Sequence, residues 1–463
     1  MNPTIFREYD IRGIAGKDLT ASFAHNLGLT YAEWAIEKTG RTKLKISVGR
    51  DCRLTSDEYA AALIEGLRSG GLDVLDIGVC PTPLTYFSIH HYKTDGGIMI
   101  TGSHNPAEYN GFKIGLGKDT LHGEQIQELK RVMMSAKFGT RPKGTLSTAS
   151  IIPEYIDYVA AQIKPAKKLK VVLDAGNGTA SNVAPELFHK MNAEVIPLFC
   201  ELDGRFPNHH PDPTVPKNLS ALIDAVKKHK ADFGIGYDGD SDRIGAVDEN
   251  GKIIYGDELM VIFAREVLKT HPGATIISEV KSSQRLYQDI KKHGGNGIMW
   301  KTGHSLIKSK MKETGAALAG EMSGHIFFAD RWFGFDDAIY SSARLYEIVA
   351  RSGTLSSLIS DLSPVVNTPE IRIDCEEDKK FALIEEAAKV LMDSQATLTT
   401  IDGLRVDYSD HWGLIRASNT QPVIVMRFEA QTEQKLKEIQ NQFEAALNSA
   451  AKKLGHGEFK YGH

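Results

Sequence analysis

Three aspartates at alternate positions, Asp238, Asp240 and Asp242, are the residues of this sequence whose spacing points most directly to chemistry. In an extended segment such side chains share one side, and three carboxylates gathered there repel one another unless a cation holds them together. Oxygen ligands suit Mg²⁺ or another hard divalent ion. An EF-hand loop is a poor alternative, because Arg243 occupies the position where that loop requires glycine. A solvated acidic turn remains an alternative, since turns favour Asp and Gly.

A serine on a tight loop is a candidate nucleophile. Residues 97–100 form a short apolar run typical of a buried strand, and Gly102 permits a sharp turn after it. Pro106 cannot donate a ladder hydrogen bond, so the strand must end before it. Ser103 is therefore expected at a strand end, where a ligand can reach its hydroxyl. An ordinary strand-exit turn uses the same residue types, so this stretch alone leaves both interpretations open.

Two further loops carry polar side chains suited to binding hydroxyl groups and phosphate. Glu321, Ser323 and His325 alternate and offer an acceptor, a hydroxyl and an imidazole that titrates near neutral pH. A later loop combines a guanidinium with hydroxyl, amide and backbone N–H donors, a set that would hold a phosphate well. The residues of this loop are Arg416, Ser418, Asn419 and Thr420. Taken singly, each of these side chains could equally be a structural polar residue of a turn.

These loops follow a repeated pattern of strands and helices, which indicates several domains. Three times, short apolar strands alternate with helices and end in a polar, glycine-containing loop, a pattern typical of βαβ units and mostly parallel sheets. Active sites of such sheets gather at the carboxyl ends of the strands, where Ser103 would lie. From about Pro369 the pattern changes to short strands with two helices, which indicates a smaller α+β domain.

The expected fold class is three tandem α/β domains with mixed, mostly parallel sheets, followed by a smaller α+β C-terminal domain, around a central cleft. We place the domains at residues 1–150, 151–251, 252–366 and 367–463. Expected helices cover residues 20–38, with Thr20 as N-cap, and 55–69, 84–92, 153–162, 180–191, 218–229, 283–293, 378–392 and 431–453. Expected strands cover residues 44–48, 74–79, 97–100, 169–174, 195–199, 233–237, 244–247, 274–280, 297–301, 316–319, 371–373, 397–401, 404–408, 412–416 and 423–430.

Composition and charge exclude several classes of protein. The 463 residues are 41% hydrophobic and 25% charged, as in an ordinary globular protein. The net charge of −4 gives no reason to expect nucleic acid as a partner. The 4 cysteines are scattered without C-x-x-C spacing, which favours a reducing compartment. No signal peptide and no run of about 20 apolar residues is apparent, so we expect a soluble, cytoplasmic protein that does not bind membranes.

Together, the four loops resemble the α-D-phosphohexomutase family over the whole chain. The resemblance rests on four motifs in one order, at residues 101–106 (Thr-Gly-Ser-His-Asn-Pro), 238–243 (Asp-Gly-Asp-Ser-Asp-Arg), 320–325 (Gly-Glu-Met-Ser-Gly-His) and 416–422 (Arg-Ala-Ser-Asn-Thr-Gln-Pro). Within the family, a motif with Met at position 322 resembles the phosphomannomutase/phosphoglucomutase branch, whereas phosphoglucosamine mutases usually have Gln at this position. The joint match makes the ordinary-turn interpretation of Ser103 much weaker.

The resemblance implies an enzyme that interconverts hexose 1-phosphates and hexose 6-phosphates. Ser103 would carry a phosphoryl group as phosphoserine, and one of its phosphate oxygens would bind Mg²⁺ together with Asp238, Asp240 and Asp242. The enzyme would phosphorylate the free hydroxyl of its substrate, so a hexose 1,6-bisphosphate would form, turn over and return its other phosphate to Ser103. Glucose 1,6-bisphosphate would act as an activator.

The resemblance also implies roles for the remaining candidate residues. Glu321 and Ser323 would hold the sugar O3 and O4 hydroxyls in both orientations. The loop of Arg416, Ser418, Asn419 and Thr420 would anchor the distal phosphate. Arg12 and Lys113 would support the transfer electrostatically, and His325 is the candidate general base. The other positions matching the family near the reacting phosphate or sugar are Tyr9, Arg243, Lys281 and His304, the last also as a catalytic residue.

Several alternatives stay open from the sequence. Phosphoglucosamine mutase is a close one, and a non-catalytic sugar-phosphate-binding protein or a metal phosphohydrolase using the aspartates are more distant. The partners expected are small hexose phosphates, and we expect a monomer. The choice between mannose and glucose is not determined by these motifs.

Overall fold

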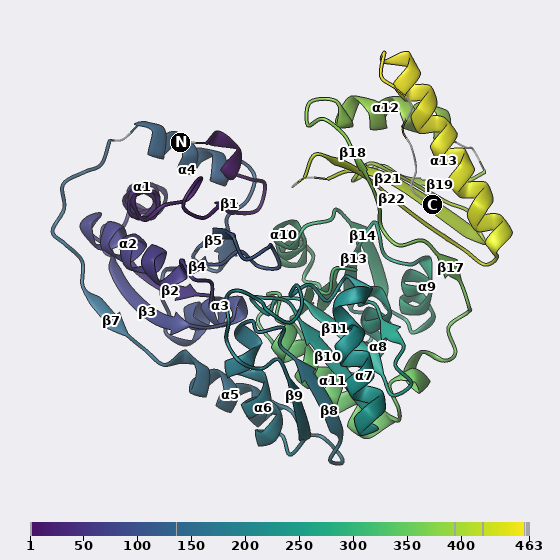
Figure 1. The fold of residues 1–463 in the computed structure, drawn as a ribbon, viewed down its shortest axis with the longest axis horizontal. Helices are drawn as coiled ribbons and strands as arrows, with labels where there is room; N and C mark the ends of the chain where they lie inside the picture. The colour runs from purple at the N-terminus through teal and green to yellow at the C-terminus, as the bar shows by residue number, and fades with distance from the viewer. Residues whose placement is uncertain (1, 136, 393–394, 419–420, 458, 460–463) are drawn as a thin grey trace.

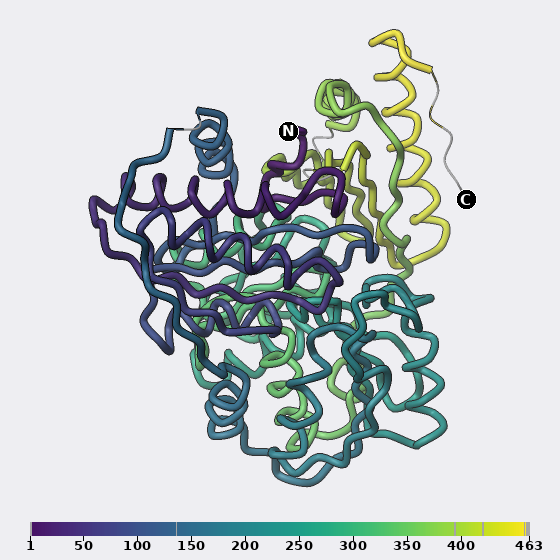
Figure 2. The backbone as a smooth tube through the Cα atoms, turned by 60° about the vertical axis from the view of Figure 1, so that its left-hand side comes forward, coloured from purple at the N-terminus to yellow at the C-terminus, as the bar shows by residue number. Residues whose placement is uncertain are grey.

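The computed structural model describes residues 2–135, 137–392, 395–418, 421–457 and 459. These residues form four sheets that follow one another along the chain (Figure 1). The smoothed backbone shows the C-terminal part, in yellow, as a lobe at the upper right (Figure 2). None of the described helices combines the length and apolar character that crossing a membrane would require.

The first sheet contains the strand on which the Ser103 loop depends. Its order is β1-β5-β4-β2-β3-β7, with β6 beside β5. Strand β5 turns back antiparallel to β4, whereas β4, β2, β3 and β7 are parallel. The strands are β1 (Ile11–Ile14), β2 (Lys45–Arg50), β3 (Asp73–Val79), β4 (Gly96–Ile100), β5 (Tyr109–Leu116), β6 (Asp119–Thr120) and β7 (Leu146–Thr148). The helices are α1 (Ala21–Thr39), α2 (Ser56–Ser69), α3 (Thr82–His91) and α4 (Glu124–Ser135). As predicted, the Thr20 side chain caps α1 by accepting a hydrogen bond from Phe23 N.

The second and third sheets repeat the plan of parallel strands finished by an antiparallel one. The second sheet has the order β12-β11-β10-β8-β9, and the third β14-β13-β15-β16. In each, the turn where the chain first reverses into an antiparallel pair carries a site loop, between β10 and β11 and between β15 and β16. The strands are β8 (Lys170–Asp174), β9 (Glu194–Leu198), β10 (Phe233–Tyr237), β11 (Ile244–Asp248), β12 (Ile253–Ile254), β13 (Thr275–Glu279), β14 (Asn296–Trp300), β15 (Leu318–Gly320) and β16 (Ile326–Phe328). The helices are α5 (Ile151–Gln162), α6 (Ala184–Lys190), α7 (Ser220–His229), α8 (Gly256–Thr270), α9 (Gln284–Lys292), α10 (His304–Thr314) and α11 (Ala338–Ser352).

The fourth sheet is antiparallel and follows the order β17-β22-β21-β20-β19, with β18 beside β22. Helices α12 and α13 pack against it through their apolar faces. The strands are β17 (Val366–Asn367), β18 (Ile371–Asp374), β19 (Thr397–Thr399), β20 (Leu404–Asp407), β21 (His411–Ala417) and β22 (Val423–Ala430). The helices are α12 (Lys380–Leu391) and α13 (Glu433–Lys453).

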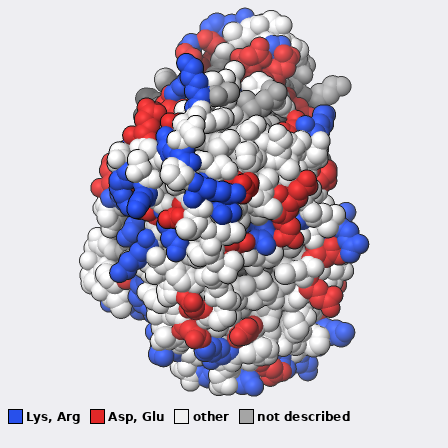
Figure 3. Space-filling model, turned by 90° about the vertical axis from the view of Figure 1, so that its left-hand side faces the viewer, with Lys and Arg blue, Asp and Glu red and all other residues white. Residues whose placement is uncertain are grey.

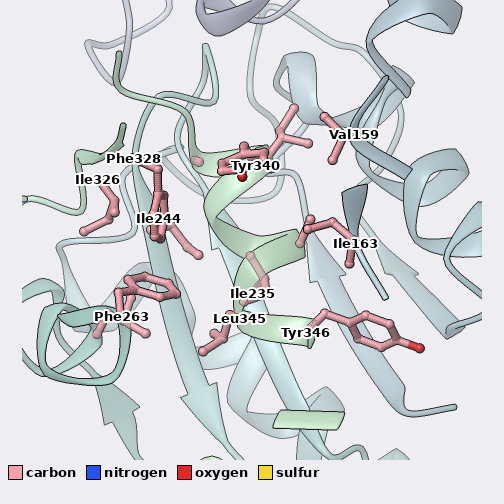
Figure 4. Packing of buried hydrophobic residues seen from close by; sticks show 14 of the residues in the cluster. Val159, Ile163, Ile235, Ile244, Phe263, Ile326, Phe328, Tyr340, Leu345 and Tyr346 are labelled. Carbon is pink, nitrogen blue, oxygen red and sulfur yellow. The ribbon is translucent and has the colours of Figure 1, made fainter. Parts of the chain in front are cut away.

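The second and third units share one apolar core. Tyr340, Leu345 and Tyr346 on α11 lie among side chains of both units (Figure 4). These neighbours include Ile235 on β10 and Phe263 on α8. Part of the first unit joins this core through Leu75 of β3 and Phe87 of α3, whereas the rest of the first unit and the fourth unit each have a core of their own. The shared core packs together the two units that carry the loops after β10 and β15.

Every helix and strand expected from the sequence is present within a few residues, but the structure also contains α4, α8, α11, β1, β5, β6, β7, β12, β16 and β17, which were not expected. Residues 338–350 of α11 are all buried, so its sequence shows no apolar stripe with a polar face opposite. Most of α8 is buried in the same way. Strand β5 contains Gly111 and Gly115, which weaken a strand pattern. These elements depend on tertiary packing that local periodicity does not reveal.

One side of the molecule shows how its surface charges are distributed. Lysine and arginine lie interspersed with aspartate and glutamate across this face (Figure 3). Mixed signs agree with the small net charge of −4. This face therefore carries charges of both signs.

A buried carboxylate at the start of α11 predicts a pH dependence of stability. Asp337 accepts hydrogen bonds from Tyr340 N at 2.8 Å and from the Tyr155 hydroxyl of α5 at 2.9 Å. Burial raises the pKa of Asp337 to about 7, from 3.8. Because the folded state binds the Asp337 proton more tightly than the unfolded state, protonated Asp337 stabilises the fold. This contribution to the unfolding free energy is fully present below the unfolded pKa of 3.8 and is lost as pH rises through 7.

We expect Asp337→Asn to remove this dependence, because the amide keeps an acceptor and carries no charge. Between pH 4 and 7 the wild type should lose about 2–4 kcal/mol of unfolding free energy relative to the variant. Denaturant unfolding at several pH values measures the difference, with exposed Asp224→Asn as control. Parallel pH profiles for wild type and Asp337→Asn would contradict the assignment.

Candidate active site

The Ser103 loop leaves β4 in a strained turn that directs the hydroxyl at the acidic loop. Ser103 has φ of 49°, in the left-handed region that few non-glycine residues adopt. Its backbone N donates to Thr101 Oγ1 at 2.8 Å. Its Oγ donates to Asp238 Oδ2 at 3.1 Å, and His104 Nδ1 lies 3.1 Å from the same Oγ. The hydroxyl predicted as nucleophile thus faces the aspartates predicted as metal ligands.

The three aspartates lie on the turn between β10 and β11 and are completely buried. Asp238 Oδ1 accepts from the backbone N of Asp242 at 3.1 Å and of Arg243 at 3.0 Å, which closes the turn. Gly239 is required here, because a Cβ would lie 2.6 Å from the Ser103 carbonyl oxygen. One oxygen of each carboxylate lies within 4.8 Å of the others. The extended segment predicted from the sequence is wrong, because the backbone forms a tight turn here. The three carboxylates nevertheless converge.

This cluster has the donor set and the unsatisfied atoms that a cation site needs. Asp240 Oδ1 and Asp242 Oδ1 are buried and have no hydrogen-bond partner among the described residues, although Asp242 Oδ1 lies 3.3 Å from His325 Nε2 as an ion pair. Buried carboxylate oxygens without partners are costly, and a hard divalent cation would satisfy them. Burial, with Asp240 and Asp242 nearby, raises the pKa of Asp238 well above its ordinary value. The cluster can therefore hold a metal ion.

Lys113 lies between two of the carboxylates and supplies a fixed positive charge. Strand β5 places Lys113 at this position, because it runs antiparallel to β4 with Lys113 opposite Met99. Its Nζ donates to Asp240 Oδ2 at 2.7 Å and also to Asp242 Oδ2. Burial would lower the pKa of Lys113, but these two carboxylates outweigh it and raise the pKa well above its ordinary value. Lys113 therefore remains an ammonium beside the acidic loop.

The loop between β15 and β16 brings Glu321, Ser323 and His325 to the same place. His325 Nδ1 lies 2.9 Å from Glu321 Oε2 and 3.0 Å from Ser323 Oγ, and Nε2 lies 3.3 Å from Asp242 Oδ1. Burial would lower the pKa of His325, but Asp242 and then Glu321 raise it to about 9. An imidazolium must lose its proton before it can act as a base, so the general-base role of His325 stays a prediction.

His304 and Tyr9 lie beside this loop. The rings of His304 and His325 are stacked with centroids 5.5 Å apart, and the Tyr9 ring meets His304 edge-on at 5.7 Å. Tyr9 donates its hydroxyl hydrogen to Thr302 O at 2.9 Å. Gly303, with φ of 133°, leaves no room for a Cβ, which would lie 2.4 Å from the Tyr9 hydroxyl. Residues from the first and third units thus form one surface.

Two arginines lie beside the site loops. Arg12 pairs with Asp10 and donates to Asn105 Oδ1 at 2.8 Å, within the Ser103 loop. Its Nε is buried and has no hydrogen-bond partner among the described residues. Arg243 Nε lies 3.3 Å from His325 Nε2. Both guanidinium groups are suited to phosphate oxygens.

The predicted phosphate anchor lies on the fourth sheet and contacts the third unit. Arg416 Nε donates to Asp402 Oδ2 at 3.0 Å, and the backbone N of Thr302 donates to the same oxygen at 3.0 Å. Lys281 Nζ donates to Glu370 Oε2 at 3.1 Å, which links the third unit to the start of the fourth. Ser418 follows β21 and is buried. Asn419 and Thr420 lie outside the described residues.

Four family models match this chain in order. Their descriptions are phosphoglucomutase/phosphomannomutase alpha/beta/alpha domains I, II and III and C-terminal domain, and they match residues 3–139, 153–251, 255–365 and 370–446. The chain belongs to the phosphoglucomutase/phosphomannomutase family. This membership makes it an enzyme of intramolecular phosphoryl transfer, and it confirms the predicted resemblance and fold class.

Individual members of the phosphoglucomutase/phosphomannomutase family match the chain over nearly its full length. A phosphomannomutase/phosphoglucomutase of Pseudomonas putida is 48% identical over 445 residues, covering 96% of this chain and 95% of that protein. A phosphoglucomutase of Neisseria meningitidis serogroup A is 47% identical over 448 residues, covering 96% and 97%. A crystal structure of a phosphoglucomutase/phosphomannomutase family protein from Burkholderia thailandensis has a TM-score of 0.91 and 43% identity, covering 96% and 97%.

Some residues at this phosphoglucomutase/phosphomannomutase site carried no signal in the sequence. Thr82 Oγ1 donates to Asp240 Oδ2 at 2.5 Å. Asp336 Oδ2 lies 3.4 Å from His304 Nδ1 and Asp402 holds Arg416. Each partner is remote in sequence, so only the folded chain reveals these contacts.

Proposed function

We propose that this enzyme interconverts the 1-phosphates and 6-phosphates of mannose and glucose through phospho-Ser103 and a hexose 1,6-bisphosphate. The observation that carries the proposal is the 3.1 Å hydrogen bond from Ser103 Oγ to Asp238, beside two carboxylates with unsatisfied oxygens. The names of the relatives, which include both phosphomannomutase/phosphoglucomutase and phosphoglucomutase, support these two sugars over glucosamine. We further propose that it works in the cytoplasm as a monomer, with small hexose phosphates as its partners.

Asp238, Asp240, Asp242 and a phosphoserine oxygen would together hold Mg²⁺. When bound, Mg²⁺ would neutralise charge on the phosphoryl group and on the leaving serine oxygen. The residues present fit it, because two buried carboxylate oxygens have no hydrogen-bond partner in the described part of the chain. Lys113 and Arg12 add fixed positive charge beside the same serine loop. The three aspartates would thus bind Mg²⁺, while Lys113 and Arg12 would stabilise the negative charge of the transferred phosphoryl group.

In the transfer step, the bond between phosphorus and Ser103 Oγ breaks as the sugar hydroxyl oxygen bonds to phosphorus. The sugar hydroxyl loses its proton and Ser103 Oγ gains one, so charge and protons balance. His325 is our candidate for the group that takes the sugar proton, once it has lost its own, and Lys113, which is held as an ammonium, would assist the movement of that proton electrostatically. His304 stacks on His325 and would hold that ring in place while the proton moves.

The sugar would be gripped in two orientations by the same side chains. Glu321 and Ser323 would bind O3 and O4, whose positions are alike in both poses. Arg416, Ser418, Asn419 and Thr420 would hold the phosphate not being transferred, with Lys281, Arg243 and Tyr9 beside the substrate. Stereochemistry at C2 would then be recognised weakly, which is why we propose both glucose and mannose phosphates as substrates.

A substrate comparison tests this proposal. Glucose, mannose and glucosamine 1-phosphates are each incubated with enzyme, Mg²⁺ and a trace of glucose 1,6-bisphosphate. We expect isomerisation of the glucose and mannose compounds at comparable rates, dependence on the bisphosphate, and little release of inorganic phosphate. Reaction of the amino sugar alone would assign a phosphoglucosamine mutase, and stoichiometric phosphate release would assign a phosphohydrolase.

A further inference from the structure

Arg53, just after β2, is buried beneath the Ser103 loop and binds its backbone. Its guanidinium donates to four carbonyl oxygens of that loop, those of Ser103 (2.8 Å), Asn105 (2.5 Å), Pro106 (2.6 Å) and Tyr109 (2.9 Å). The side chain is only 1% exposed. A single buried guanidinium therefore binds four carbonyl groups of the loop at once.

Asp51 completes this cluster from the other side. Its carboxylate accepts from Arg53 Nε at 3.1 Å, from Arg53 N at 3.0 Å and from Ser56 Oγ at 2.6 Å. It also accepts from the backbone N of Gly102 at 3.2 Å, immediately before Ser103. The buried pair thus holds both N–H and C=O groups of the loop. Breaking a buried pair of this kind is expensive, because the remaining charge is left uncompensated.

The cluster is packed too closely to rearrange. A Cβ on Gly102 would lie 2.5 Å from Arg53 Nε, so only glycine lets the loop approach the guanidinium. On its other side, Arg53 lies over the Phe206 ring of the second unit at 5.0 Å. A Cβ on Gly204 would lie 2.6 Å from Arg53 Cα. Arg53 is consequently fixed between the serine loop and the unit that carries the acidic turn.

This arrangement explains how Ser103 keeps its unfavourable backbone conformation. A serine in the left-handed region is unfavourable and persists only where its surroundings determine it. Here the Ser103 carbonyl is held by Arg53, and the preceding amide by Asp51. With the backbone held at both points, Ser103 Oγ faces Asp238 at 3.1 Å.

We propose that Arg53, paired with Asp51, is a positioning residue for phosphoryl transfer at Ser103. The hydrogen bonds of its side chain go to Asp51 and to the backbone of the Ser103 loop, so it would act by fixing the backbone on which the phosphoserine is carried. The inference rests on the proposed function of Ser103 as phosphoryl carrier. Because small displacements of a reacting group reduce rates strongly, loss of this clamp should slow transfer while leaving substrate binding almost intact.

The test uses the full-length enzyme with Arg53→Lys, which keeps the charge but loses the fork of donors. Arg50→Lys is the matched control, since Arg50 ends β2 and pairs with Asp57 and Asp76, away from the serine loop. The rate of Ser103 phosphorylation by glucose 1,6-bisphosphate is followed by quenched intact-mass analysis, together with kcat, KM and Tm. We expect Arg53→Lys to slow phosphorylation and lower kcat about 100-fold, with KM changed less than about threefold.

A second variant covers the case in which Arg53→Lys does not fold. Gly102→Ala forces a Cβ against the guanidinium without removing any charge, and the same slow phosphorylation is expected. Wild-type phosphorylation rates in a folded Arg53→Lys, or in Gly102→Ala, would overturn the inference. An equal slowing of phosphorylation in Arg50→Lys would also overturn the inference. The same holds if a rise in KM accounts for the whole loss of activity in Arg53→Lys. If the wild-type enzyme itself acquires no phosphate, the proposed function fails instead.

Discussion

Ser103→Ala is expected to reduce mutase activity at least about a thousandfold, the largest loss of any single substitution in this chain. Alanine lacks the oxygen that would accept the phosphoryl group, and among the described residues no other side-chain hydroxyl donates to Asp238. The methyl group fits the space of the serine side chain, so folding should be preserved. Initial rates with glucose 1-phosphate measure the loss, and exposed Ser360→Ala serves as control.

The same variant should also lose the mass signature of the phosphoenzyme. Wild-type protein treated with glucose 1,6-bisphosphate should gain one phosphoryl increment on a peptide containing Ser103, and Ser103→Ala should gain none. An unchanged increment in the variant would place the phosphate on another residue. Substantial isomerisation by Ser103→Ala would remove Ser103 from the mechanism altogether.

Asp240→Asn is expected to lower kcat by about three orders of magnitude and to abolish the response to Mg²⁺. The substitution removes one of the three charges that would hold the ion, and it breaks the contact with Lys113 at 2.7 Å. Asp238 is a poorer choice of test, because its Oδ1 also closes the turn through two backbone hydrogen bonds. Asp240 Oδ1 has no hydrogen-bond partner among the described residues, so replacing this carboxylate should weaken Mg²⁺ binding more than it destabilises the fold.

Thermal unfolding provides a readout of the metal site that does not depend on activity. A ligand that binds only the folded state raises Tm, so Mg²⁺ should raise the Tm of chelator-treated wild type by a few degrees. The Tm of Asp240→Asn should respond little, whereas exposed Asp224→Asn should respond as wild type does. An equal Mg²⁺ response in Asp240→Asn would show that the ion binds elsewhere.

Much of the fold and of the candidate site could be predicted because each site loop has local composition cues. The Asp238 turn and the Ser103 loop follow apolar strands whose pattern is clear, and the structure brings both together. Helix α11 could not be predicted, because it is buried on all sides and lacks a polar face. Arg53 gave no signal either, since its partners are backbone carbonyls about fifty residues away. The catalytic roles of His325 and Lys113 stay predictions, because they depend on where a proton moves.

One measurement tests most directly whether Ser103 passes its phosphate to the sugar. Enzyme carrying radiolabelled phosphate on Ser103 is mixed with excess unlabelled glucose 1-phosphate and Mg²⁺, quenched within one turnover, and its products are separated. We predict that the label leaves the protein and appears first in glucose 1,6-bisphosphate and then in glucose 6-phosphate. Unlabelled glucose 6-phosphate forming while the label stays on the protein, or label released as inorganic phosphate, would contradict the proposed mechanism.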